Sequence, residues 1–248
     1  MPRIAYQLYC SRNFPPLDDT LRKLSELGYR DVEGFGGLLA DADGLKSALE
    51  ANDLAMPSCH FALDMLEKDA AGAIATAKAL GIGKMIIPFL MPEHRPSDSA
   101  GWAAFGKRLT EAGKPVQDAG LVFGWHNHAF EFDATPEGDM PLDLIADASP
   151  DLMLELDLGW VRVAGHDPLA WIKKYAGRLT AVHVKDIAPD GTAVEEDGWA
   201  DVGHGIQDWA AIHSALQQAS VDHYVVEHDN PSDDMRFARR SLAAVQSF

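Results

Sequence analysis

The chain has 248 residues, 47% of them hydrophobic and 24% charged, which is the composition of a soluble globular protein with a large core rather than of a disordered chain. Its formal net charge of −17 at pH 7 argues against nucleic acid and anionic membranes as partners, because both select a basic surface. The length is one at which barrels of alternating strands and helices commonly close.

Short apolar runs alternate eight times with longer segments of helical spacing. We expect strands over residues 4–8, 31–33, 55–59, 84–89, 121–125, 152–156, 179–183 and 224–227. The intervening segments carry apolar residues three or four positions apart, as in Trp209, Ile212 and Leu216, which predicts helices that pack on a sheet. Ser97 and Asp208 are the expected N-caps of two of these helices.

Strands that alternate with helices imply parallel pairing, and eight such units imply a closed barrel or an open doubly wound sheet. The first strand is followed by residues 9–12, YCSR, not by a Gly-x-Gly-x-x-Gly turn, and polar residues end many strands. We therefore predict an α/β fold with one domain over residues 1–248, a single (β/α)8 TIM barrel. The longest irregular stretch, residues 187–207, is predicted to be a flap that orders over bound substrate.

In such a barrel the side chains that perform chemistry lie at or just past the C-terminal ends of the strands. There the sequence has mainly carboxylates and imidazoles: Glu33, His60, His126, His128, Glu131, Asp157, His183, Lys185, Glu227 and Asp229. Carboxylate and imidazole without thiolate suit one divalent ion, Mn²⁺, Mg²⁺, Co²⁺ or Zn²⁺, in a catalytic site that keeps positions open for substrate.

Glu155 and Asp157 are two positions apart on the sixth predicted strand, so both point into the barrel. For Asp157, at the strand end, metal ligation is the favoured interpretation. For Glu155 two interpretations remain open: it ligates the metal, or it belongs to a polar layer of the barrel and pairs with a lysine or arginine. His183 and Lys185 share one face of the seventh strand, and Glu227 ends the eighth, where a structural ion pair is the alternative to ligation.

Five segments, in order, resemble the sugar phosphate isomerase/epimerase group of the xylose isomerase-like TIM barrels: residues 126–132 (HNHAFEF), 154–161 (LELDLGWV), 183–186 (HVKD), 202–209 (VGHGIQDW) and 226–229 (VEHD). The resemblance implies that Asp157, His183 and Glu227 bind the metal. In the epimerases of this group the fourth ligand is a Glu three residues before an Asn, a position that is Gly124 here. The similarity to histidine-rich members such as inosose dehydratases leaves Glu131 or one of the two histidines, His126 and His128, as its replacement, and Glu131 is favoured.

With Glu131 as the fourth ligand, His128 is the expected base, assisted by Lys185 and Glu227. Substrate contacts are expected from Glu33, His60, His126, Trp160 and His204. The implied reaction is isomerisation or epimerisation of a small sugar, in which a proton is removed next to a carbonyl and the metal stabilises the enediolate.

Three alternatives to isomerisation remain open at this stage. Loss of a β-hydroxyl from the same enediolate would make the protein a dehydratase or lyase on a keto-sugar or inosose. A catalytically silent carbohydrate-binding barrel is the second alternative. A nuclease like endonuclease IV is the third, and the acidic charge and the small number of ligands for three zinc ions disfavour it.

The sequence predicts a cytoplasmic protein whose partner is a small sugar or keto-sugar, without nucleic acid or membrane. The first residues lack the charged n-region and apolar h-region of a signal peptide, and no run approaches the ~20 apolar residues that span a bilayer. Cys10 and Cys59 supply neither a disulfide framework nor a cysteine-rich zinc site. The oligomeric state, a homo-oligomer included, is left open.

Overall fold

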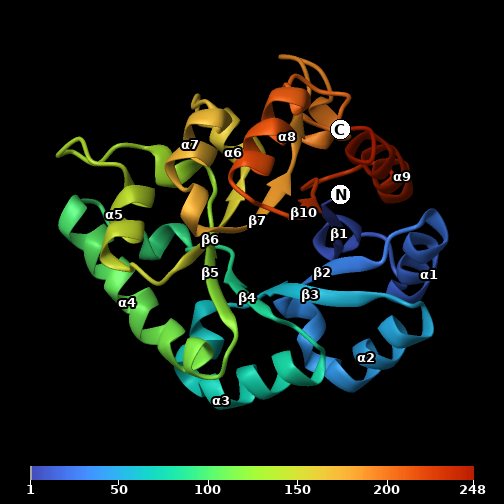
Figure 1. Cartoon of the computed structure of the whole chain (residues 1–248), viewed down its shortest axis with the longest axis horizontal. Coiled ribbons are helices and arrows are strands. Elements are labelled where there is room, and N and C mark those ends of the chain that lie inside the picture. The colour runs from blue at the N-terminus through green and yellow to red at the C-terminus, as the bar shows by residue number, and fades with distance from the viewer. Residues whose placement is uncertain (1) are drawn as a thin grey trace.

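A computed structural model describes residues 2–248, in which eight parallel strands close into a barrel surrounded by helices (Figure 1). The barrel strands are β1 (Arg3–Gln7), β2 (Asp31–Phe35), β3 (Ala55–His60), β4 (Lys84–Ile87), β5 (Val122–His126), β6 (Met153–Asp157), β7 (Leu179–Val184) and β10 (His223–Val226). The order around the barrel follows the chain, and β10 pairs with both β7 and β1. The predicted TIM-barrel fold is therefore confirmed, and every predicted strand overlaps an observed one.

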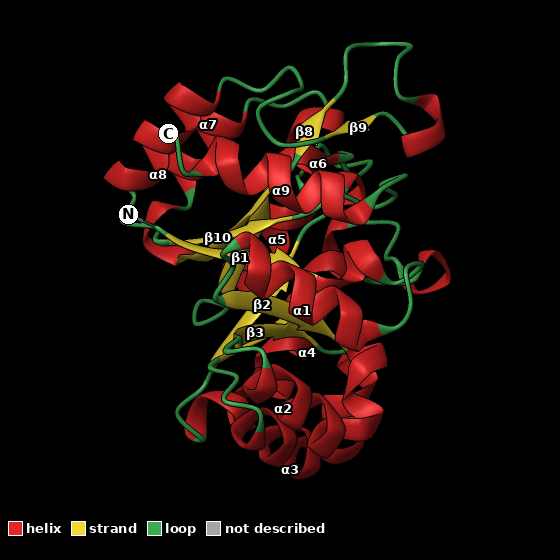
Figure 2. Cartoon of the chain, turned by 90° about the vertical axis from the view of Figure 1, so that its right-hand side faces the viewer, coloured by secondary structure: helices red, strands yellow, loops and turns green. Residues whose placement is uncertain are grey.

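The helices form the outer layer of the barrel. They are α1 (Leu17–Leu27), α2 (Ala42–Ala51), α3 (Leu63–Ala79), α4 (Ser99–Asp118), α5 (Pro141–Ala148), α6 (Leu158–Val163), α7 (Pro168–Lys174), α8 (Trp209–Gln218) and α9 (Asp234–Val245). Short 3-10 turns are η1 (Leu8–Ser11), η2 (Gly36–Asp41), η3 (Pro92–His94), η4 (Ala129–Phe132), η5 (Ala176–Arg178) and η6 (Val194–Glu196). In Figures 1 and 2, α1 and α9 lie side by side, and the two ends of the described chain lie near one another.

Helix α8 shows how the predicted apolar stripe works. Trp209, Ile212 and Leu216 are buried in the core between helices and strands, and Asp208 caps the helix by accepting a hydrogen bond from Ala211 N. The predicted N-cap of α4 is wrong by one position, because Asp98 and not Ser97 has the extended backbone and the side chain that accepts from Gly101 N. No helix among residues 2–248 is long and apolar enough to cross a membrane.

The long segment between β7 and α8 leaves the barrel and forms a small antiparallel sheet, β8 (Asp186–Ile187) and β9 (Trp199–Ala200), next to α6 (Figure 2). The buried Asp186 carboxylate accepts four backbone N–H groups, from Ile187, Gly203, Gly205 and Gln207, and the indole N–H of Trp209. Position 205 requires glycine, because a Cβ there would lie 2.3 Å from the carbonyl oxygen of Ile187. The base of the predicted flap is thus tied to the strand that carries the site.

Strand register brings the polar strand ends together at one mouth of the barrel. Parallel pairing places His126 of β5 beside Glu155 of β6, and Asp157 of β6 beside His183 of β7. Glu227 follows β10 directly, one position past the residue that pairs with Val184 of β7. Residues distant in the sequence therefore meet without a specialised loop.

Candidate metal centre

The mouth of the barrel encloses a buried cluster of ionisable side chains instead of an apolar plug. Within it, Glu33, Glu155, Asp157, His126, His183 and Lys185 are all at most 1% exposed, and Glu227 is 5% exposed. Charged groups are rarely buried in this way unless they are paired or hold an ion. Two overlapping sets within this cluster have donor atoms close enough for one metal ion. The inner set is His60, His126, Glu155 and His183, and the outer set is His126, Asp157, His183 and Glu227.

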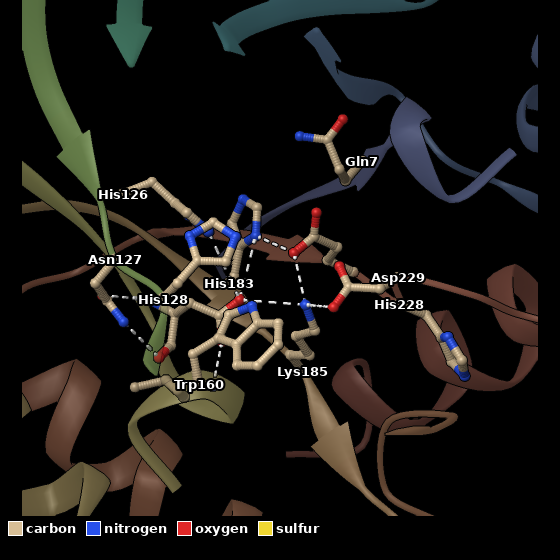
Figure 3. A network of polar contacts seen from close by, with 12 residues as sticks. Gln7, His126, Asn127, His128, Trp160, His183, Lys185, His228 and Asp229 are labelled. Atoms are coloured by element: carbon tan, nitrogen blue, oxygen red, sulfur yellow. Dashed lines mark hydrogen bonds and ion pairs between the residues drawn. The ribbon is translucent and has the colours of Figure 1, made fainter. Parts of the chain in front are cut away.

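The outer set takes one donor from each of four consecutive positions around the barrel, β5, β6, β7 and the end of β10: His126, Asp157, His183 and Glu227. Their donor atoms all lie within 4.8 Å of one another. Asp157 Oδ2 is 3.9 Å from His126 Nε2 and 3.8 Å from His183 Nδ1, and His183 Nδ1 is 2.8 Å from Glu227 Oε2. Figure 3 shows His126 and His183 converging at the centre of this network.

The deeper carboxylates distinguish the two sets. His183 uses its other nitrogen, Nε2, to contact Glu33 Oε1 at 2.8 Å and Glu155 Oε2 at 3.1 Å, and His126 Nδ1 lies 3.3 Å from the same Glu155 oxygen. Metal-binding histidines typically present their second ring nitrogen to a carboxylate in this way, which fixes the ring orientation and raises its basicity. The arrangement therefore favours the outer set as ligands, with Glu33 and Glu155 as the carboxylates that orient them.

The electrostatics also fit a cation at the outer set. Asp157 Oδ2 is buried without a hydrogen-bond partner, and burial raises the pKa of Asp157 to about 7 against the lowering effect of Lys185. Burial lowers the pKa of His126 to about 4, and the neighbouring His183 adds to this effect. The His126 ring is therefore neutral and able to bind a metal ion. A divalent ion would compensate the unpartnered carboxylate oxygen that this site otherwise buries at a cost.

Two further groups of the cluster are already paired. Although burial opposes it, Glu33 and Glu155 raise the pKa of His60 to about 9, and His60 Nε2 lies 2.7 Å from Glu155 Oε2. Lys185 Nζ lies 2.7 Å from Asp229 Oδ2 and 3.2 Å from Glu227 Oε2. Glycine at position 159 leaves room for the Lys185 stem, since a Cβ there would come within 2.9 Å of it.

A cavity of about 480 Å³ opens above the outer set. His126, His128, Trp160 and Glu227 are among its lining residues, and the rings of His128 and Trp160 are 5.3 Å apart (Figure 3). The buried Nδ1 of His128 and the indole nitrogen of Trp160 have no hydrogen-bond partner among the described residues. Burial, and then the neighbouring His126, lower the pKa of His128 well below 6.5. The rings of His128 and Trp160 thus form part of the cavity wall, with these two nitrogen atoms buried behind it.

Most of the predicted site residues meet at this centre, but Glu131 and His204 do not. Glu131 is buried beside the cluster, where its carboxylate accepts hydrogen bonds from Trp125 Nε1 at 3.0 Å and His128 N at 2.8 Å. The structure does not support the prediction of Glu131 as the fourth ligand, because neither candidate ligand set includes it and both of its oxygens hold the turn after β5. His204 is exposed on the flap and accepts from Arg240 Nε at 3.2 Å, outside the cavity lining, which corrects its assignment to substrate.

His126 takes the position that sequence analysis gave to Glu131. It had been expected to contact substrate, and the structure places it among the candidate ligands as well as in the cavity wall. The sequence carries a signal for this role, because His126 is the last residue of β5 and an inward side chain at that position reaches the mouth of the barrel. The partner of Glu155 is also different from expectation, since histidines pair with it rather than a lysine or arginine.

Residues 21–246 match the family model described as the xylose isomerase-like TIM barrel. Among curated proteins, an inosose dehydratase of Clostridium beijerinckii is 25% identical over 137 residues, which cover 50% of this chain and 46% of the relative. The aligned part thus spans about half the length of that relative. Several other inosose dehydratases match at 23% to 33% identity.

Solved structures share the whole fold at lower identity. A sugar phosphate isomerase/epimerase from Parabacteroides distasonis superposes with a TM-score of 0.83 at 20% identity, over 100% of this chain and 94% of the other. The IOLI protein with a bound zinc atom superposes with a TM-score of 0.79 at 16% identity, over 100% and 97% of the two chains.

Proposed function

This chain belongs to the xylose isomerase-like TIM-barrel family, and we propose that it is a divalent-metal-dependent enzyme that removes a proton next to the carbonyl of a small keto-sugar or inosose. The observation that carries the proposal is the convergence of His126, Asp157, His183 and Glu227 directly beneath the cavity. The zinc in the IOLI protein supports it, because that protein has the same fold.

The ligand assignment follows from the contacts of the outer set. His126 and His183 offer the ring nitrogens that face away from the deep carboxylates, and Asp157 and Glu227 each offer one oxygen. When bound, the ion polarises the substrate carbonyl and stabilises the negative charge that develops on its oxygen during deprotonation.

His128 is the proposed base. It lines the cavity, its ring centroid lies 5.0 Å from that of His126, and burial lowers its pKa well below 6.5, which keeps the ring neutral. The rings of Phe89 and Trp160, 4.9 and 5.3 Å away, hold the imidazole and limit water around it. The Trp160 ring lies beside His128 in the cavity wall, so contact of the substrate with this ring would orient its C–H bond toward His128.

We propose that proton removal is followed by loss of a β-hydroxyl, so that the enzyme is a dehydratase. Two other basic groups that line the cavity are engaged, since Asp229 pairs with Lys185 and His60 pairs with Glu155, and the third, Glu227, is assigned to the metal. Epimerisation uses a second acid or base on the opposite face of the substrate carbon, whereas in elimination one group can serve twice: His128 takes the proton from carbon and returns it to the departing hydroxyl, which leaves as water. The names of the curated relatives agree with dehydration.

Isomerisation or epimerisation is the second candidate, and the position of Glu227 in the cavity wall favours it. Glu227 lines the cavity with its carboxylate at the mouth, so a substrate held between His128 and Glu227 could receive a proton from either side. The Parabacteroides distasonis neighbour carries a name of that class.

The test follows solvent deuterium into a keto-sugar and inosose panel with Zn²⁺-, Mn²⁺- or Co²⁺-loaded protein. Exchange with appearance of an unsaturated ketone supports dehydration, and exchange into the recovered sugar or its epimer supports the second candidate. His128→Asn should retain the metal and reduce exchange by about 10² to 10⁴, the effect expected for a general base. Absence of both deuterium exchange and unsaturated ketone in every metal-loaded form would contradict both candidates and leave a binding protein.

A further inference from the structure

We infer that Arg12 binds an anionic substituent of the substrate, and that this substituent is a carboxylate. The inference rests on the proposed function, because it concerns the molecule that occupies the same cavity. It goes beyond that function because it narrows the substrate from a neutral keto-sugar or inosose to a keto acid.

The guanidinium of Arg12 is held at the cavity wall by two contacts. It lies 4.0 Å from the centre of the Tyr9 ring, and its Nη1 donates to the Tyr9 carbonyl oxygen at 3.0 Å. These contacts use one of five N–H donors, so most of the planar fork is free. Within residues 2–248, no carboxylate lies within 4.0 Å of this guanidinium as an ion-pair partner.

The turn that carries Arg12 is tied to the buried polar cluster. Tyr9 N donates to Gln7 Oε1 at 3.1 Å, and Gln7 Nε2 donates to Glu33 Oε1 at 2.7 Å. Figure 3 shows Gln7 at the edge of the network around His183. These bonds fix the turn relative to the candidate metal centre, and the exposed Arg12 side chain is placed at the cavity wall by its two contacts with Tyr9.

The charges around the cavity leave Arg12 as a cation without an anionic partner. The cavity-lining Asp229 and Glu227 are already compensated by Lys185, at 2.7 and 3.2 Å. Arg12 is the single lysine or arginine among the described residues that line the cavity. In a protein of net charge −17 the overall field repels anions, so an anionic substrate needs a local, unpaired cation, whereas a neutral sugar does not.

A carboxylate fits this end of the cavity better than a phosphate group. The planar arginine fork matches the two oxygens of a carboxylate. A phosphate dianion carries a third oxygen and more charge, whereas the Arg12 guanidinium lies against the aromatic pair Tyr9 and Phe35, and no second lysine or arginine is among the described residues that line the cavity.

The test compares matched ligands that differ at one position: methyl 3-keto-glucoside, its 6-carboxylate, the methyl ester of that acid, and its 6-phosphate. Binding is followed by tryptophan fluorescence, since Trp160 lines the cavity. A carbocyclic inosose and a keto-cyclitol carboxylate form a second pair. We expect the carboxylates to bind about 10- to 100-fold more tightly than the ester or the neutral ketones, the range for a hydrogen-bonded charge.

Arg12→Gln should remove this preference, and Arg12→Lys should retain part of it. Arg239→Gln is the control, because it makes the same change of charge at an exposed position on α9 outside the cavity. Equal affinities of wild-type protein for carboxylate and ester, tighter binding of the phosphate, or an equal loss for all ligands in Arg12→Gln would each overturn the inference.

The outcomes separate the inference from the proposed function. Preferential carboxylate binding without deuterium exchange supports the role of Arg12 and contradicts the enzymatic proposal. Exchange in the neutral ketones with no effect of Arg12→Gln supports the enzyme and contradicts the anionic substrate. Failure of all these ketones to bind would contradict both.

Discussion

Replacing Asp186 with Asn should destabilise the protein by releasing the base of the flap. Its Oδ2 accepts from Gly203 N, Gly205 N and Trp209 Nε1, and its Oδ1 accepts from Ile187 N and Gln207 N. A carboxamide oxygen can keep the first three donors, but its NH₂ group would face the other two. Each buried donor without a partner costs about 1–3 kcal/mol, and partial exposure of Gln207 favours the low end, so we expect a loss of about 2–3 kcal/mol.

Thermal unfolding checks this value. For a chain of this size, 1 kcal/mol corresponds to about 2–4 °C in Tm, so Asp186→Asn should lower Tm by about 4–12 °C. Asp190→Asn is the matched control, because Asp190 is exposed on the same segment and should leave Tm unchanged. A stability of Asp186→Asn within about 0.5 kcal/mol of wild type, the range of ordinary surface substitutions, would refute the role given to this carboxylate.

Three further outcomes follow from the site. His126→Asn should lose the metal, whereas Glu131→Gln should retain it; metal analysis after dialysis showing the reverse would restore Glu131 as the ligand. Burial raises the pKa of Glu131 to about 8, above its unfolded value, so the stability that its protonated form contributes is present at low pH and lost as pH rises through about 8. Urea unfolding at about pH 6 and about pH 9 should therefore show a decline in wild type that Glu131→Gln lacks, and parallel declines would contradict this. Bound keto-ligand should protect the flap tip around Val194, which is 73% exposed, from proteolysis; equal cleavage with and without ligand would argue against a lid.

The fold was predictable because its signals are local and repeated. Alternating strand and helix periods identify the barrel, and the apolar stripe of Trp209, Ile212 and Leu216 shows which face of a helix packs inward. The small sheet formed by β8 and β9 was not predicted, because its two-residue strands depend on the Asp186 carboxylate and on the absence of a Cβ at Gly205. Such contacts join residues about twenty positions apart and leave no periodic pattern.

The site was predictable where strand position alone decides the geometry. Asp157, His183 and Glu227 end three neighbouring strands, and the structure brings them together as the topology requires. The choice between His126 and Glu131 depended on where the chain turns after β5. Glu131 is drawn into that turn by the N–H groups of Trp125 and His128, and no spacing rule in the sequence reveals this.

The central claim is that one divalent ion binds to the outer set of ligands. The most direct measurement is an anomalous difference map from crystals grown with Zn²⁺ or Mn²⁺. We predict a single strong peak within about 2.0–2.3 Å of His126 Nε2, His183 Nδ1 and one oxygen each of Asp157 and Glu227. A peak coordinated by Glu131, a peak among the deep carboxylates, or no peak at the mouth of the barrel would contradict the account.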